Sequence, residues 1–182
     1  PRVRRQRQMC IRDSVKMDKS AASVNITSVD INALTELILR RLRPIAKKTD
    51  IELTLISKRE IIAEVDEVKL SLILTNLIEN AIKYNREQGK VNVILDADHQ
   101  FFTVQVADTG IGIPEDSIQH IYERFYRVDK SHSREIGGTG LGLAIVKHIL
   151  MRLKGELKLV STPGQGTIIT IAFPSCEEDT DR

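Results

Sequence analysis

Three polar side chains in the segment NLIENAIKY, residues 76–84, recur at the spacing of one helix face. At about 100° per residue, Asn76, Asn80 and Lys83 fall within roughly 60° of one another, away from the apolar stripe of the same helix. Two carboxamide oxygens and an ammonium group on one face suit a hydrated magnesium ion and the phosphates that it bridges. Taken alone, the segment is equally compatible with an ordinary solvated face.

A carboxylate and two glycines follow an alternating apolar run in ADTGIGIP, residues 107–114. Asp108 is the last residue of the predicted strand, where a buried carboxylate could accept a hydrogen bond from an adenine amino group. Gly110 and Gly112 would let the backbone approach a flat ring, because glycine carries no Cβ. The other interpretation is a common Asp-Thr-Gly turn that closes a strand.

Four glycines stand at the start of an apolar run in GGTGLGLAIVKH, residues 137–148. The N–H groups at the beginning of a helix form an anion site, and glycine removes side chains that would block phosphate. A loop before an ordinary helix is the other interpretation. A dinucleotide fingerprint would need a preceding strand, and a Walker-type loop would need a Lys where Leu143 stands, so both common nucleotide motifs are excluded.

Hydrophobic periodicity predicts the elements that must position these segments. Helices are expected over residues 30–48, with Asp30 as the cap, over 66–84, and over about 140–152. Strands are expected at 51–56, 61–65, 90–97, 101–108, 156–162 and 166–173. We expect the first two strands to pair around a charged turn and the last two around PGQG. The predicted apolar helix stripes are Leu34, Leu37, Ile38, Leu42 and Ile45, and then Leu70, Leu74, Leu77, Ala81 and Tyr84.

The order of these elements predicts the fold class. It is α/β: a two-layer α/β sandwich in which one mixed, mostly antiparallel sheet is covered by about three helices on one face. The polar stretch VKMDKSAASVNITSV, before the first helix, is expected to be a linker.

Composition excludes several classes of partner. The 182 residues carry 27 Lys and Arg against 25 Asp and Glu, and a formal charge of +2 gives little support to nucleic-acid binding. No apolar stretch approaches the roughly 20 residues needed to span a bilayer. Cys10 and Cys176 are too few to form a disulfide framework and are not in metal-ligand spacing, which fits a reducing, cytosolic setting.

Together and in this order, NLIENAIKY, DTGIGIP, IYERFYRVDKS and GGTGLGLAIVKHI resemble the N, G1, F and G2 boxes of sensor histidine kinases. The resemblance implies the catalytic ATP-binding domain of that family, with the Bergerat fold and with ATP and Mg²⁺ as ligands. It implies that this domain spans residues 29–174. Residues 1–28 would combine a leader of native or foreign origin with the end of a dimerisation hairpin and its linker, and 175–182 would form an acidic tail.

The same resemblance implies roles for individual residues. Asn76 and Asn80 would hold magnesium, Lys83 would contact the phosphates, Arg127 would reach the γ-phosphate, and Asp108 would select adenine. Asn76, Lys83 and Arg127 are therefore the predicted catalytic residues. The rest of the predicted ATP-binding set is Tyr84, Gly110, Gly112, Ile113, Phe125, Tyr126, Gly138, Thr139, Gly140, Leu141, Gly142 and Thr167.

The family's phosphoacceptor histidine is missing from this sequence. Relatives carry it on a helical hairpin before the ATP-binding part, whereas His99, His120, His132 and His148 lie within or after that part. The resemblance therefore implies two partners, the hairpin of a homodimeric parent kinase and a response regulator. It also implies a cytoplasmic domain of a bacterial protein, with any membrane anchor in segments outside this sequence.

Two other functions are open at this point. Bergerat-fold ATPases and anti-sigma-type serine kinases carry Glu where this chain has Asn76, and that carboxylate acts as a general base. A carboxamide cannot take up the proton, so Asn76 favours a histidine kinase. A degenerate domain that only binds a partner is the third interpretation, which the intact boxes disfavour.

Overall fold

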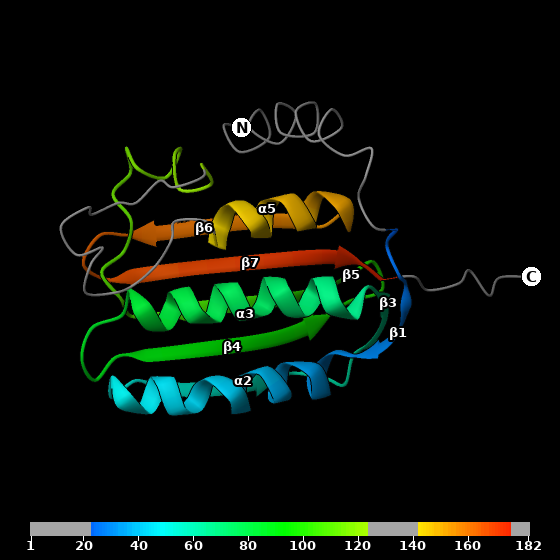
Figure 1. The fold of residues 1–182 in the computed structure, drawn as a ribbon, viewed down its shortest axis with the longest axis horizontal. Coiled ribbons are helices and arrows are strands. Elements are labelled where there is room, and N and C mark those ends of the chain that lie inside the picture. Colours follow the sequence, from blue (N-terminus) through cyan, green and yellow to red (C-terminus); the bar gives the residue numbers. More distant parts are fainter. Residues whose placement is uncertain (1–22, 124–141, 176–182) are drawn as a thin grey trace, which may run out of the picture.

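The computed structural model describes residues 23–123 and 142–175, which form two layers (Figure 1). In this part of the chain, three helices lie side by side over one face of a five-stranded sheet. The helices are α2 (Ile31–Lys48), α3 (Glu67–Lys83) and α5 (Gly142–Arg152). The strands are, in spatial order, β2 (Glu52–Ser57), β4 (Lys90–Ala97), β5 (Phe101–Asp108), β7 (Gly166–Pro174) and β6 (Glu156–Thr162). The predicted two-layer α/β sandwich is confirmed.

The five-stranded sheet is mixed, as predicted. Strand β2 runs parallel to β4, and the other neighbours are antiparallel. A separate antiparallel pair, β1 (Thr27–Asp30) and β3 (Ile62–Val65), lies at one end of the molecule (Figure 1). The expected pairing of residues 51–56 with 61–65 is therefore wrong, as is the expectation of a single sheet. Strand β1 lies in the segment that we expected to be a linker.

Hydrogen bonds at the start of α2 explain this different pairing. The N–H of Ile31 donates to the carbonyl of Ile61 at 2.9 Å, and the N–H of Ile61 donates to Asn32 Oδ1 at 2.9 Å. These bonds hold the beginning of β3 beside the end of β1. Segment 51–56 is thereby left to pair with β4, 38 positions along the chain, in the register Glu52 to Lys90.

The core lies between the helices and the sheet. Every second residue of β4, β5 and β7 is buried beneath the helices: Val91, Val93, Leu95, Phe102, Val104, Val106, Ile169, Ile171 and Phe173. Phe102 and Phe173 stack with ring centroids 5.1 Å apart. This alternation follows from the two-residue period of a strand that has one face against the core.

Most residues of the predicted apolar helix stripes are buried, as expected, but three of them are exposed. In α3, Leu70, Leu74, Leu77 and Ala81 are buried, whereas Tyr84 follows the helix and is 38% exposed. In α2, Leu34, Ile38 and Leu42 are buried, but Leu37 and Ile45 are 45% and 46% exposed. The buried face of α2 includes Leu39 and Ala46 instead, because the contacts with α3 and β2 set its rotation.

Candidate functional site

Helix α3 carries the first predicted site segment and begins at a strong cap. Asp66 Oδ1 accepts a hydrogen bond from the N–H of Lys69 at 3.0 Å, and Oδ2 accepts bonds from the N–H of Asn25 at 2.8 Å and from Lys69 Nζ at 3.1 Å. Burial by itself raises the pKa of Asp66, but these bonds outweigh it, and the pKa is lowered from 3.8. The cap fixes where α3 begins, and so which residues face outward.

The start of α5 lies against the predicted polar face of α3. Asn76 and Asn80 are both half-buried, and Asn76 Nδ2 donates to the carbonyl of Leu72 at 2.8 Å. A Cβ placed on Gly142, the first residue of α5, would lie 3.2 Å from Asn76 Oδ1 and 3.5 Å from Asn80 Nδ2. The fold therefore brings together two segments that are separated by more than sixty residues. Lys83, half-buried, is the last residue of the same helix.

The carboxylate of Asp108 is held by two main-chain donors at the end of β5. Its Oδ1 accepts hydrogen bonds from the N–H of Gly110 at 2.9 Å and of Thr167 at 3.1 Å. Burial raises the pKa of Asp108 above its ordinary value, and the two bonds offset this only in part. No group of residues 23–123 or 142–175 donates to Oδ2, so that oxygen is available to a ligand donor.

The two glycines after Asp108 are required by contacts within the protein. A Cβ on Gly110 would overlap the carbonyl oxygen of Tyr84. Gly112 has φ +72°, and a Cβ there would overlap the carbonyl of Thr162. The close contacts of these glycines within the protein are with the end of α3 and the end of β6, whereas their approach to a flat ring stays a prediction.

A hydroxyl pair joins this loop to strands β6 and β7. Ser161 Oγ accepts a hydrogen bond from the N–H of Ile113 at 2.8 Å and lies 2.7 Å from Thr167 Oγ1. Thr167 is buried, at 7% exposure, and its main chain donates to Asp108 as described above. Ile113 and Thr167, both predicted site residues, therefore belong to one hydrogen-bonded wall beside Asp108.

The turn after α3 contributes side chains that sequence reasoning missed. Arg86 Nη2 donates to the carbonyl of Gly110 at 3.2 Å and to the carbonyl of Gly164. Asn85 Oδ1 accepts hydrogen bonds from the N–H of Arg86 at 2.9 Å and from Thr109 Oγ1 at 3.2 Å. The only signal in the sequence was a polar turn after a helix, since the partners lie up to 78 positions away.

The remaining predicted residues lie outside the part of the chain that the structure describes: Phe125, Tyr126, Arg127, Gly138, Thr139, Gly140 and Leu141. Within the described residues, no group of three or more His, Cys, Asp or Glu side chains could hold a metal ion. A cation near Asn76 and Asn80 would therefore rely on carboxamide oxygens and on oxygens of a ligand, a donor set that suits magnesium.

Among residues 23–123 and 142–175, no helix has the length and apolar character that crossing a membrane needs.

Comparison with known proteins identifies the family. The family described as histidine kinase-, DNA gyrase B-, and HSP90-like ATPase matches residues 65–177. Sensor protein kinase WalK of Staphylococcus epidermidis is 39% identical over 170 residues, which cover 91% of this chain and 28% of that kinase. The mycobacterial sensor histidine kinase MprB has a TM-score of 0.71 at 28% identity, covering 83% of this chain and 98% of that one.

A further solved structure, full-length ShkA in complex with AMPPNP, has a TM-score of 0.76 at 27% identity and covers 94% of this chain and 37% of that one. Of the WalK sequence, by contrast, this chain spans little more than a quarter of the length. Because the family match covers more than half of the sequence, the chain belongs to the histidine kinase-, DNA gyrase B-, and HSP90-like ATPases, as an ATP-binding catalytic domain of the sensor histidine kinase type.

Proposed function

We propose that this chain binds ATP together with Mg²⁺ and that its parent protein transfers the γ-phosphate to a histidine on a separate dimerisation hairpin. The observation that carries the proposal is the approach of Gly142 to Asn76 and Asn80. The N–H groups in the first turn of α5 would bind anionic phosphates, and the neighbouring carboxamides would offer oxygens to a cation. A side chain on Gly142 would reduce the space between them.

The adenine end of the proposed site is Asp108. Its Oδ1 is occupied by two main-chain donors, which fixes the carboxylate plane and leaves Oδ2 for an exocyclic amino group. Adenine presents such a donor, whereas guanine presents a carbonyl at the equivalent ring position. Asp108 therefore favours ATP over GTP. ShkA, a relative by fold, was solved with the ATP analogue AMPPNP, which supports this assignment.

The proposed residues bind and orient rather than activate a nucleophile. The start of α5 and Lys83 would face the phosphates, and Arg127 is proposed to stabilise charge on the γ-phosphate. A magnesium ion held by Asn76 and Asn80 would neutralise negative charge on the phosphate oxygens. The Nδ2 amide of Asn76 donates to a main-chain carbonyl, and a carboxamide has no basic group, so Asn76 cannot activate water as a general base. The proposed acceptor, the imidazole of the hairpin histidine, has a nucleophilic nitrogen of its own and needs no such activation.

Proposed partners follow from this chemistry. The phosphoacceptor would be the hairpin of the parent kinase, which we propose to be a homodimer. A response regulator would receive the phosphoryl group from that histidine. Because ATP is the proposed substrate, we place the domain on the cytoplasmic side of a membrane-anchored parent.

The proposal is tested with labelled ATP and a separately prepared hairpin domain from the parent protein. We expect slow hydrolysis by the chain alone, no self-labelling, and acid-labile, base-stable label on the hairpin. Asn80→Ala should weaken magnesium-dependent ATP binding, measured by calorimetry with and without a chelator. The matched control, Asn92→Ala, changes an Asn on the sheet face away from the helices and should leave binding unchanged. Fast hydrolysis without the hairpin would favour an ATPase instead, and label on the chain's own histidines would contradict the proposal.

A further inference from the structure

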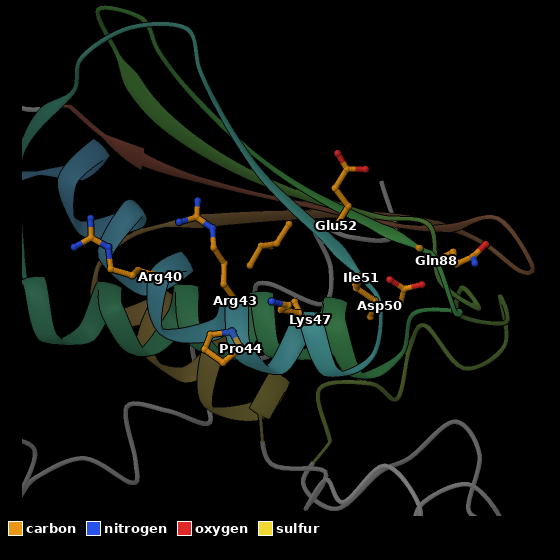
Figure 2. A pocket seen from close by; sticks show the side chains of 11 residues that line it. Arg40, Arg43, Pro44, Lys47, Asp50, Ile51, Glu52 and Gln88 are labelled. Atoms are coloured by element: carbon orange, nitrogen blue, oxygen red, sulfur yellow. The ribbon is translucent and has the colours of Figure 1, made fainter.

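A groove of about 770 Å³ lies beside the outer edge of the sheet, on elements that the proposed nucleotide site does not use (Figure 2). Its walls are the C-terminal half of α2, the start of β2 and the turn at Gln88 and Gly89. Its apolar lining consists of Pro44, Ala46, Ile51 and Leu53. The groove thus joins apolar surface to a strand edge.

Three cations from α2 line this groove. Arg40, Arg43 and Lys47 follow one another at a spacing of three and four residues, so they share one helix face (Figure 2). Arg43 pairs with Glu36 at 3.1 Å, but both side chains are well exposed and the pair is weak. Arg40 and Lys47 form no ion pair or side-chain hydrogen bond with any residue of the described ranges.

The acids of the groove lie at its other end. Asp50 and Glu52 flank the turn into β2, and Glu52 is engaged by Lys90 at 3.5 Å (Figure 2). The α2 side of the groove is therefore cationic and its turn side is not. Pro44 has no N–H, so the carbonyl of Arg40 lacks the donor that it would otherwise have four residues along the helix. That carbonyl is therefore an additional main-chain acceptor on the cationic side of the groove.

Strand β2 has an open edge along this groove. The N–H of Glu52 donates to the carbonyl of Gly89, and β2 pairs with β4 alone among the described strands. In a parallel ladder alternate residues face the same neighbour, so the N–H and C=O groups of Leu53 and Leu55 point away from β4. No charged residue protects the edge between Glu52 and Lys58, although charges commonly block such edges.

We propose that this groove is a docking site for an extended, acidic segment of a partner protein, which adds as a strand to the open edge of β2. The segment would pair with the main chain of Leu53 and Leu55 and place carboxylates against Arg40, Arg43 and Lys47. The three cations span about 10 Å of helix, and alternate residues of a strand lie about 7 Å apart, so two carboxylates cover the row.

Charge also argues for a different protein rather than a second copy of this chain. Edge-to-edge pairing of two β2 strands would bring the same three α2 cations of each copy toward one another, and like charges repel. The proposal is independent of nucleotide binding, because Asp108, Asn76 and Asn80 lie on other elements.

The test uses the full 182-residue chain and the labelled peptide carboxyfluorescein-Glu-Val-Glu-Val-Glu-Val-amide. Anisotropy should report saturable binding. A peptide with Gln in place of Glu should bind more weakly, and one methylated at the main-chain nitrogens of alternate residues should not bind. The double variant Arg40→Gln/Lys47→Gln should weaken binding at least about fivefold. The matched control, Arg41→Gln/Lys48→Gln, removes the same charge from exposed α2 positions outside the groove. Because these side chains do not line the groove, the control should change binding less than about twofold.

Amide exchange measured by NMR locates the peptide. The amides of Leu53 and Leu55 should become protected when the peptide is bound, whereas those of Thr54 and Ile56, which already face β4, should not change. No binding, equal losses in the two double variants, or unchanged exchange at Leu53 and Leu55 would each overturn the proposal. Self-association of the chain that the peptide displaces would show that a second copy occupies the edge, and would overturn it too.

Discussion

The guanidinium of Arg86 donates hydrogen bonds to the carbonyl oxygens of Gly110 and Gly164, the first at 3.2 Å. One side chain at the end of α3 thereby fixes both the loop after β5 and the β6–β7 turn. The loop after β5 supplies the N–H of Gly110, and strand β7, which follows the turn, supplies the N–H of Thr167, and both donate to Asp108. The adenine end of the proposed site therefore depends on a residue that is not itself in the predicted ATP-binding set.

Replacing Arg86 should weaken nucleotide binding more than folding. Arg86→Ala removes both hydrogen bonds from the loop carbonyls, and we expect ATP affinity to fall by about 1–3 kcal/mol. Arg86→Lys should restore little, because an ammonium cannot reproduce a planar fork toward two acceptors. Calorimetry and urea unfolding measure the two effects. Arg59→Ala, which removes only a surface pair with Asp96, is the control and should leave ATP affinity unchanged. Equal ATP affinity in Arg86→Ala and the native chain would contradict a positioning role.

Asp108→Asn should separate stability from ligand selection. Burial raises the pKa of Asp108, so its contribution to stability is largest at low pH and is lost as pH rises through that raised pKa. Asn cannot ionise, and its oxygen can still accept the bonds from Gly110 and Thr167. We expect unfolding free energy at pH 7 to be equal or higher, whereas ATP affinity falls by about 1–3 kcal/mol because an amide donor faces adenine. A variant that still prefers ATP over GTP would contradict the adenine assignment.

The sequence predicted the helices and most strands well because their patterns are local. The caps Asp30 and Asp66 were followed by apolar residues at helical spacing, and both helices begin one residue after these caps. The partner of residues 51–56 could not be predicted in this way, since a parallel pair is joined through an intervening helix and carries no turn signal. Proximity in sequence favoured pairing with residues 61–65, but β3, which lies in that segment, pairs with β1 instead.

The site shows the same division between local and distant contacts. The segments carrying Asn76, Asp108 and Gly142 were recognisable because their residue types are unusual for a core. Arg86 and Ser161 have no such signature, and each is defined by partners 24 to 78 positions away. Only the folded chain places their side chains at the loop carbonyls and at the N–H of Ile113.

Two glycines with similar backbone angles should respond differently to substitution. Gly112 has φ +72° and a crowded Cβ position against Thr162, whereas Gly164 has φ +77° and open space. Gly164→Ala should cost about 1 kcal/mol for the left-handed conformation alone. Gly112→Ala should cost at least about 2 kcal/mol, since overlap is added to strain. Chemical denaturation of the two variants measures the difference, and equal losses would show that the loop moves freely away from β6.

Asp66 should make the fold sensitive to acid. Although burial raises its pKa, hydrogen bonds from Lys69 and Asn25 prevail and lower it from 3.8. A carboxyl with a lowered pKa stabilises the fold fully above its unfolded pKa, and this contribution is lost as pH falls through the folded value. Asp66→Asn keeps a capping oxygen but loses the charge. The stability difference between native chain and variant should therefore be constant near pH 7 and shrink below about pH 4. A difference that grows on acidification in urea titrations would contradict this assignment.

Gly142→Ala should impair the proposed phosphate end of the site with little change in the stability of the domain. Alanine gains at most about 1 kcal/mol over glycine in a helix interior, and at this first helical residue a tight contact of its methyl group with Asn76 offsets the gain. The added methyl would lie 3.2 Å from Asn76 Oδ1 and 3.5 Å from Asn80 Nδ2, so it would narrow the space between the helix start and the carboxamides. We expect ATP affinity in excess magnesium to fall more than affinity measured with a chelator. Ile145→Ala, an exposed position on the same helix, should leave that ratio unchanged. If Gly142→Ala left the ratio unchanged as well, the approach of α5 to Asn76 and Asn80 would be packing alone, without a role in cation binding.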